Sequence, residues 1–294
     1  MTTTSNFSHS IAKKNTISAY IFLAPALLLF GLFVIFPMLF GLFASFFKYN
    51  LNTFKFIGLQ NYIQMFKDPI FIKGLLNTIL IVVVAVPTVC AFSLWIATVI
   101  NPMKTFTRSF YRCVFYLPVV TGSVAVTVVW KWMFNSYTGL INNVLGTKGF
   151  NWIGNPDTAL WCIILILFTT SVGQPIVLYV AALGNVDHSL TEAAMVDGAN
   201  KRQVFWNVKW PQMLPTTLYI IVITTINSFQ CFALIQLLTN GGPNHSTETI
   251  MYYIYYQAYK IGEFGYGSAM GIALAIMIAL FSAVQFKLAQ TEKR

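Results

Sequence analysis

The strongest chemical signal in this sequence is a short polar segment between two long apolar runs. Its residues are Glu192-Ala193-Ala194-Met195-Val196-Asp197-Gly198-Ala199, and a basic segment with Lys201 and Arg202 follows. Carboxylates on a short exposed helix are suited to a charge-complementary contact with another protein. The segment therefore predicts a structured docking element on the surface of a membrane-embedded protein.

Local signals predict the structure of this segment. Ser189 and Glu192 have the S-x-x-E spacing of a capping box, which indicates a helix start. Asp197 and Gly198 predict its end, because glycine adopts the left-handed conformation at little cost. A second helix is expected to begin at Asn200. The spacing alone fits equally well a loop that only caps its own ends on the membrane surface.

A second set of polar side chains recurs within three apolar runs that are long enough to cross a membrane. Residues three or four positions apart share a helix face, so each group forms a stripe. The stripes are expected to converge on a solute cavity near the membrane midplane. They contain Ser123, which shares a face with Thr127, in the first run, Thr170, Ser171 and Gln174 in the second, and Thr224, Asn227 and Ser228 in the third.

Helix association is the alternative role for these side chains. Ser, Thr, Asn and Gln join transmembrane helices by hydrogen bonds worth about 0.6 kcal/mol each on average. Gln174 and Asn227 are the stronger candidates for solute binding, because a carboxamide can form several hydrogen bonds and is costly to leave unpaired in lipid. Phe229, Phe232 and Trp130 could stack on a ring of the solute or simply pack.

The apolar runs carry no charge at their centres, which favours a neutral, hydroxyl-rich solute. A charge at the bilayer centre costs at least ~2.5 kcal/mol, and transporters of ions or acidic solutes often retain one as a pathway marker. Loop lysines could still serve an anion.

Catalysis by this chain has little support in the sequence. An integral membrane enzyme, such as a lipid-modifying transferase, needs converging carboxylates or histidines. The chain has 8 acidic residues and 3 histidines, with no DxxD-like or HxxxH pair. It also lacks a G-x-x-x-x-G-K-[ST] phosphate loop, so we expect no bound cofactor. A lipid-modifying enzyme and a stand-alone channel remain the alternatives, although a channel would not explain the capped polar helix.

The composition indicates that most of the chain is embedded in a membrane. The chain is 57% hydrophobic and 9% charged, against roughly 25% charged in soluble domains, and its mean hydropathy is +0.68. A helical span needs about 20 apolar residues, and about six such runs occur. They are Ile17 to Phe47, Gly74 to Ile100, Cys113 to Trp130, Thr158 to Leu183, Met213 to Leu238 and Tyr266 to Phe286.

Basic residues predict the orientation. If both termini are cytoplasmic, the cytoplasmic segments contain eleven of the 18 Lys and Arg residues, including three in the short loop after the second span. The positive-inside rule therefore favours this orientation. It also accounts for the net charge of +10, so no nucleic-acid partner is expected.

The polar segment resembles a known family signature. Glu192-Ala193-Ala194 with Asp197-Gly198-Ala199, followed by Phe205, Val208 and Pro211, is similar to the EAA loop of permease subunits in binding-protein-dependent ABC importers. Trp210 departs from the leucine usual in that family. Leu234 to Pro243, Ala24-Pro25-Ala26 and Gly265-Tyr266-Gly267 are similar to maltose- and glycerol-phosphate-type sugar permeases, so the resemblance covers nearly the whole chain.

The resemblance implies an all-α integral membrane protein with the type I ABC importer permease fold, of the first-permease type. Residues 1–16 and 289–294 would be cytoplasmic tails of a permease domain spanning 17–288 in a bacterial cell membrane. The loop at about 187–211 would be the coupling loop that enters a cytoplasmic ATPase, with ATP and Mg bound on that partner. Its contact residues would be Glu192, Ala193, Ala194, Asp197, Gly198 and Ala199.

The same resemblance implies the other partners. These are a second permease subunit that completes a heterodimeric pore, an ATPase dimer, an extracellular solute-binding protein and the membrane lipid. The solute would be a carbohydrate, and the resemblance fixes no particular sugar.

Overall fold

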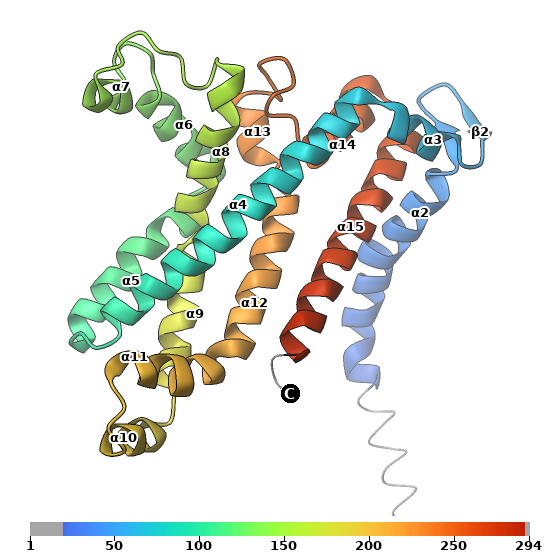
Figure 1. The fold of residues 1–294 in the computed structure, drawn as a ribbon. Coiled ribbons are helices and arrows are strands. Elements are labelled where there is room, and N and C mark those ends of the chain that lie inside the picture. The colour runs from blue at the N-terminus through green and yellow to red at the C-terminus, as the bar shows by residue number, and fades with distance from the viewer. Residues whose placement is uncertain (1–19, 292–294) are drawn as a thin grey trace, which may run out of the picture.

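The computed structural model describes residues 20–291, with side chains through Lys287. The predicted N-terminal tail, 1–16, and the last residues of the predicted C-terminal tail, 292–294, lie outside this range. The described chain is mostly helical, which confirms the predicted all-α class. An antiparallel hairpin of strands β1 (Phe47–Tyr49) and β2 (Phe54–Phe56) lies between the first two spans (Figure 1).

Long apolar helices account for the predicted membrane spans. Within residues 20–291, four helical segments are long and apolar enough to cross a bilayer, and two bent pairs bring the number to as many as six. The predicted number of spans is confirmed. The four segments are Tyr20–Ala44, Pro69–Ile100, Lys201–Leu238 and Phe264–Lys287, and the pairs are Thr105–Val120 with Ser123–Met133 and Pro156–Ser171 with Gly173–Gly184.

The individual helices have the following bounds. Those of the spans are η1 (Gly31–Ile35), α2 (Phe36–Ala44), α4 (Pro69–Ile100), α5 (Thr105–Val120), α6 (Ser123–Met133), α8 (Pro156–Ser171), α9 (Gly173–Gly184), α12 (Trp210–Phe229), α13 (Ala233–Leu238) and α15 (Phe264–Thr291). Those of the connections are α3 (Gln60–Lys67), α7 (Leu140–Leu145), α10 (His188–Val196), α11 (Lys201–Val204), η2 (Phe205–Lys209), α14 (Ile250–Tyr255) and η3 (Tyr256–Ile261).

The third span is broken, whereas the sequence predicted an uninterrupted span from Cys113 to Trp130. α5 and α6 meet at an angle of 96°. Thr121 and Gly122 between them are extended, with ψ of 127° and 144°. Pro118 removes a backbone donor from the last turn of α5, and glycine is a poor helix former by about 1 kcal/mol. The helix therefore stops at this point.

Two more interruptions lie in the fourth and fifth spans. α8 and α9 bend by 40° at Val172, and α12 ends at Phe229 before α13 begins. Hydroxyl groups from other elements bond to backbone carbonyls at both places. Ser93 Oγ donates to Val172 O at 3.2 Å, and Thr249 Oγ1 donates to Cys231 O at 3.1 Å. Lipid offers no hydrogen bonds, so irregular backbone in a membrane needs such protein partners.

α4 and α12 form the centre of the fold. α4 crosses the molecule diagonally and packs on α9 and α12, and α12 also packs on α15 (Figure 1). The helices bury side chains such as Ile176, Tyr179, Met213 and Ile220, each at most 1% exposed. This apolar packing positions the polar residues described below.

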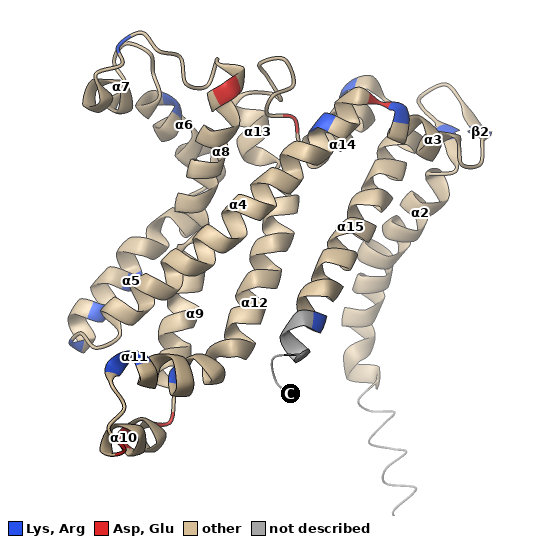
Figure 2. Cartoon of the chain, viewed as in Figure 1, with Lys and Arg blue, Asp and Glu red and all other residues tan. Residues whose placement is uncertain are grey.

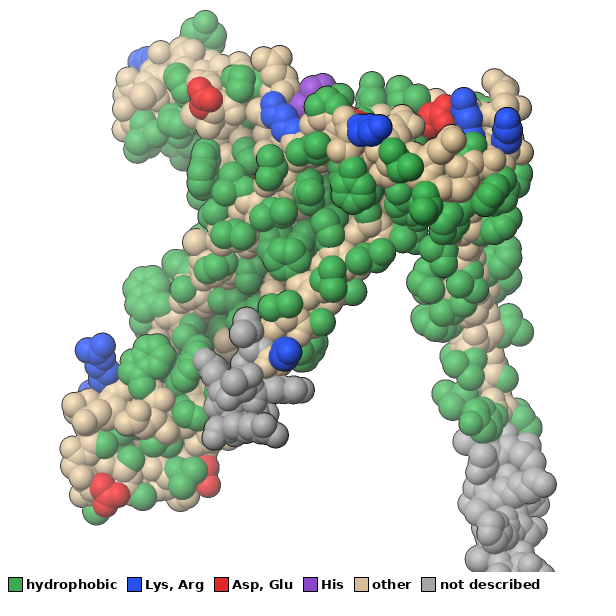
Figure 3. Space-filling model, turned by 45° about the vertical axis from the view of Figure 1, so that its right-hand side comes forward, with side chains coloured by type: hydrophobic (Ala, Val, Ile, Leu, Met, Phe, Trp, Pro, Cys, Tyr) green, Lys and Arg blue, Asp and Glu red, His purple; other side chains and the backbone are tan. Residues whose placement is uncertain are grey.

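The first span stands apart from this centre. None of its most apolar stretch is buried, and its contact with the other helices is made by α2, which packs on α15. Figure 3 shows the span as a separate leg with an open wedge beside it and hydrophobic side chains over the middle of the molecule. A long apolar helix is thus left without packing partners along most of its length.

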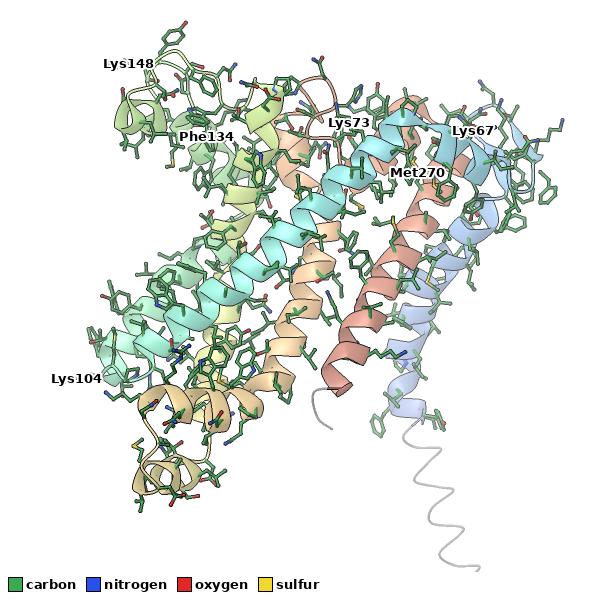
Figure 4. All side chains as sticks on the ribbon, in the orientation of Figure 1. Lys67, Lys73, Lys104, Phe134, Lys148 and Met270 are labelled. Carbon is green, nitrogen blue, oxygen red and sulfur yellow. The ribbon has the colours of Figure 1, made fainter. Side chains whose placement is uncertain are left out.

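Charged side chains divide the molecule into two ends. Figure 2 shows them at both ends of the helices, with uncharged residues between. The α10 end carries α10, α11 and the C-terminal end of α15, and the α7 end carries α7, the hairpin and α14 (Figure 1). Figure 4 places Lys104 at the α10 end and Lys67, Lys73 and Lys148 at the α7 end. This separation agrees with the predicted distribution of basic residues.

Candidate functional site: a docking helix and a polar cavity

The docking element predicted around Glu192 is the helix α10. It begins at His188, because the Asp187 carboxylate accepts a hydrogen bond from Ser189 N at 2.8 Å and caps the helix. Hydrogen bonds from Ser189 lower the pKa of Asp187. The predicted capping box of Ser189 and Glu192 is wrong, since Asp187 is the cap and Ser189 lies within the first turn.

The predicted end of this helix is confirmed. Asp197 is its C-terminal cap, and Gly198 has a φ of +86°, where a side chain would be strained. The predicted second start at Asn200 is also confirmed. Asn200 Oδ1 accepts from Gln203 N at 3.0 Å and Gln203 Oε1 accepts from Asn200 N at 2.8 Å, which forms a capping box for α11.

α10 projects from the α10 end of the molecule. It packs on α11 and η2, and of its side chains Thr191 is buried while Glu192 is exposed. Apolar side chains on it are exposed as well, with Met195 at 55% and Val196 at 87%. Figure 2 shows acidic residues on α10 and basic residues on α11. An exposed helix that combines carboxylates with apolar side chains is suited to a protein–protein contact.

Two adjoining polar cavities lie beside the three broken spans. The larger is about 260 Å³ and lies between α5, α6, α8 and the α12–α13 break. The smaller is about 120 Å³ and lies between α5, α8, α9 and α12. Val119 and Thr170 line both. Because the two cavities share these residues, we treat them as the two parts of one candidate solute site, which we call the central cavity.

The structure brings together the polar stripes that the sequence predicted. Ser123 lines the larger part of the central cavity, and Thr170 lines both parts. Ser228 is 2% exposed and lines neither part. The remaining predicted residues, Ser171, Gln174, Thr224 and Asn227, line the smaller part.

Sequence reasoning missed two polar residues of the central cavity. Thr121 and Gln230 line its larger part. Gln230 lies three positions after Asn227, so the helical spacing already pointed to it. Thr121 is exposed to the cavity only because the third span breaks there, and Pro118 and Gly122 were the available signals.

The carboxamides of the central cavity have no protein partners. The side chains of Gln174, Asn227 and Gln230 are exposed and form no hydrogen bond with any residue of the described range. Helix association, the alternative role, would instead pair them with a neighbouring helix. Their hydrogen-bonding groups are therefore available to a solute. Thr170 differs, since its hydroxyl bonds to the carbonyls of its own helix at 3.0 and 3.1 Å.

The three aromatic candidates have different positions. Phe229 is fully buried and packs edge-on against Phe281, with ring centroids 5.2 Å apart, so it cannot stack on a solute. Trp130 stacks on Phe134 at 5.6 Å. Phe232 lines the central cavity and is available for such a contact.

The central cavity is uncharged. No Asp, Glu, Lys, Arg or His side chain lines either part. Among the described residues, no group of three or more His, Cys, Asp or Glu side chains could hold a metal ion. The arrangement can bind a hydroxyl-bearing solute by hydrogen bonds and provides no constellation for acid–base catalysis.

These features define a class of protein, the polytopic helical transport subunit with a central polar cavity and a docking helix at one end. Residues 66–291 match the family of binding-protein-dependent transport system inner membrane components, and the chain belongs to this family. The predicted resemblance to permease subunits of such importers is confirmed.

The chain is similar over nearly its whole length to permeases of several transport systems. It is 35% identical over 289 residues to the probable ABC transporter permease protein YesP of Bacillus subtilis, covering 95% of this chain and 92% of that protein. It is 31% identical over 301 residues to the lactose transport system permease protein LacF of Rhizobium radiobacter, covering 100% of both. It is 30% identical over 273 residues to the multiple sugar-binding transport system permease protein MsmF of Streptococcus mutans, covering 92% and 94%.

Solved structures show the same fold. One similar chain comes from a bacterial ABC transporter involved in the import of the acidic polysaccharide alginate, with a TM-score of 0.81, 22% identity and coverage of 96% and 98%. A second comes from the alginate transporter in complex with a pentasaccharide-bound periplasmic protein, with a TM-score of 0.82, 23% identity and coverage of 96% of both chains. At these identities the similarity establishes the permease fold.

Proposed function

We propose that this chain is the permease subunit of an ATP-driven carbohydrate importer. The observation that carries the proposal is the uncharged central cavity, where Gln174, Asn227 and Gln230 present carboxamides without protein partners. Sugar hydroxyls both donate and accept hydrogen bonds, which matches a carboxamide. The names of the relatives, which include lactose and multiple-sugar permeases, support the same solute class.

In this proposal, α10 is the contact through which ATP hydrolysis on the partner drives transport. This chain has no phosphate loop, and we assign ATP and Mg to a cytoplasmic ATPase dimer that receives α10. Glu192 supplies the ionic contact, and the exposed Met195 and Val196 supply apolar area. The small residues Ala193, Ala194, Gly198 and Ala199 let the helix and its turn approach the partner closely. The α10 end and both chain termini then lie in the cytoplasm.

Two further partners complete the importer. The unburied first span and the wedge beside it offer an apolar surface for a second permease subunit (Figure 3). An extracellular solute-binding protein delivers the sugar at the α7 end. The solute then reaches the central cavity and leaves at the α10 end when the partners change conformation.

Reconstitution tests this function. The chain, its second permease and its ATPase are placed in proteoliposomes with the binding protein, and uptake of radiolabelled lactose, maltotriose and arabinotriose is measured with and without ATP. We expect uphill uptake of at least one sugar that requires ATP. Uphill accumulation by the chain alone without nucleotide would refute the proposal.

Charge reversal on α10 tests the coupling role. We expect Glu192→Lys to reduce uptake and sugar-stimulated ATP hydrolysis at least tenfold while the protein remains folded, because the ionic contact becomes repulsive. Asp157→Lys is the matched control, since Asp157 is an exposed carboxylate in the first turn of α8 at the opposite end. Normal uptake by the Glu192→Lys variant would dismiss this role.

A further inference from the structure

A second polar pocket lies at the α7 end, apart from the central cavity. It is about 420 Å³, a size typical of small-molecule sites. Its walls come from the end of α6, the segments that flank α7, and the loop Thr239–Thr249, which we call the outer loop. Phe134 lines it at the end of α6 (Figure 4). Its polar side chains are Lys131, Asn135, Ser136, Asn151 and Thr239.

Apart from the Ser136 hydroxyl, the side-chain acceptors of this pocket already accept hydrogen bonds from the protein. Asn135 Oδ1 accepts from Tyr137 N at 3.0 Å and from Thr138 N at 3.1 Å, which fixes the carboxamide orientation. Asn151 Oδ1 accepts from Gly154 N at 2.9 Å. Gly242 O accepts from the Thr247 hydroxyl at 2.7 Å.

Four donor groups of this pocket are free to bond to a ligand. Lys131 Nζ and the Nδ2 groups of Asn135 and Asn151 have no hydrogen-bond partner among the described residues, and neither has the Ser136 hydroxyl. Lys131 is exposed and forms no ion pair within the described range. No carboxylate lines the pocket. The pocket therefore offers a cation and several N–H donors but few free acceptors.

This excess of donors over free acceptors favours an anionic ligand. A neutral sugar hydroxyl needs an acceptor for its own hydrogen, whereas a carboxylate only accepts and forms its strongest bonds with a lysine and N–H groups. We propose that this pocket binds the carboxylate-bearing unit of an acidic sugar, a uronate, as the solute enters. The proposal rests on the carbohydrate importer function and deepens it. Hydroxyls are recognised in the uncharged central cavity and the carboxylate at the α7 end.

The outer loop gives the pocket a fixed wall. Thr239 and Thr247 share a hydrogen bond of 2.7 Å between their hydroxyls. Asn77 Nδ2 of α4 donates to the carbonyl oxygens of Ser246 and Glu248 at 3.1 and 2.9 Å. The donors of the pocket thus face a wall that is held in place before the sugar arrives, which lowers the cost of binding.

An acidic side chain of the binding protein is the competing occupant. The pocket is a concave space of about 420 Å³, large enough for a whole sugar unit, whereas the carboxylate end of one docking side chain would fill only part of it. The size of the pocket therefore favours the sugar, and docking of the binding protein becomes an outcome of the test.

Affinity measurements test the proposal. The assembled transporter in nanodiscs, without binding protein, is titrated with digalacturonate and with its neutral counterpart galactobiose. We expect digalacturonate to bind at least tenfold more tightly. Lys131→Gln should weaken digalacturonate binding at least tenfold and leave galactobiose unchanged. Lys148→Gln is the matched control, because Lys148 lies on the loop after α7 (Figure 4) and does not line the pocket.

Three results would overturn the proposal. They are equal affinity of the wild type for both sugars, an unchanged preference in Lys131→Gln, and a loss in that variant confined to capture of the binding protein. ATP-driven uptake separates this failure from that of the function. A wild-type importer that takes up sugars without any preference for uronates rejects the pocket alone, whereas absence of ATP-driven uptake of any sugar rejects the function.

Discussion

Replacement of Asp68 by Asn is expected to destabilise the α7 end. Asp68 Oδ1 accepts from Ile70 N at 2.9 Å and caps α4. Its Oδ2 accepts from the hydroxyls of Tyr253 and Tyr266 at 2.6 and 2.9 Å. These tyrosines are 185 and 198 residues away in the chain, so one carboxylate joins α4 to α14 and α15.

The size of the effect follows from these bonds. Hydrogen bonds to charged groups contribute about 1.5–3 kcal/mol each. An asparagine can still cap α4 through its oxygen, but its amide nitrogen can accept from neither tyrosine hydroxyl. We therefore expect a loss of about 3 kcal/mol, which corresponds to a fall in Tm of roughly 6–12 °C in a chain of this size.

The pH dependence has a definite sign. Burial raises the pKa of Asp68, but the bonds from Tyr253, Tyr266, Ile70 and Phe71 together outweigh it and hold the pKa below its usual value of 3.8. A lowered pKa means that the stabilisation is present above the unfolded-state value and is lost as the pH falls through the folded-state value. The difference between wild type and Asp68→Asn should be constant from about pH 5 to 8 and shrink below about pH 4.

Thermal unfolding of the purified protein in detergent, followed by tryptophan fluorescence, measures the effect. Asp157→Asn makes the same chemical change at an exposed carboxylate whose side chain has no described partner, and should shift Tm by less than about 2 °C. Asp68→Asn combined with Tyr253→Phe should cost less than the sum of the single changes, because they share a bond. A Tm of Asp68→Asn within about 2 °C of wild type at pH 7 would refute the reasoning.

Three other substitutions test the site and the packing around it. Asn227→Ala should raise the sugar concentration for half-maximal uptake about tenfold and leave Tm unchanged, because its side chain has no protein partner; a lower Tm would instead indicate a role in helix packing. Gly173→Ala should lower Tm, since a Cβ there would overlap the Phe115 carbonyl of α5, at a cost of about 1–3 kcal/mol, whereas Gly184→Ala has open space and should not. Burial raises the pKa of Glu248 above its usual value of 4.5, and the bond with His245 only partly offsets this, so stability should fall as the pH rises from that value through the folded-state pKa; Glu248→Gln should flatten this fall in Tm, and an unchanged pH profile would contradict this.

The sequence predicts the spans and the docking helix because both depend on local signals. Apolar runs of about 20 residues need no tertiary information to be recognised. The turn at Gly198 and the helix start at Asn200 depend on residues a few positions apart. Within the docking helix only the cap was misplaced, because Asp187 and Ser189 are both good caps and the local sequence does not decide between them.

Long-range contacts determine what the sequence could not predict. Phe229 looked equally suitable for stacking on a solute, but Phe281 of α15, 52 positions later, covers it. After the 96° bend that follows Val120, α6 packs on α13, a segment about 110 positions later, and Gly122 alone indicates only where a bend can occur. Local spacing therefore found the polar stripes but could not establish which members face the central cavity.

The chain order explains how force on α10 can reach the solute. α10 is the connection between α9 and the helix that runs through α11, η2 and α12. Gln174 lies at the far end of α9, and Asn227 at the far end of α12, so both helices carry central-cavity residues at the ends remote from α10. At 1.5 Å per residue, the stretch from Gln174 to Gly184 places Gln174 about 15 Å from the end of α9 that leads to α10. In the proposed importer, a displacement of α10 by the ATPase would therefore act on both helices at once. Ser93 and Thr249 bond to the breaks at those far ends, so the ends that carry the central-cavity residues are tied to other elements of the fold.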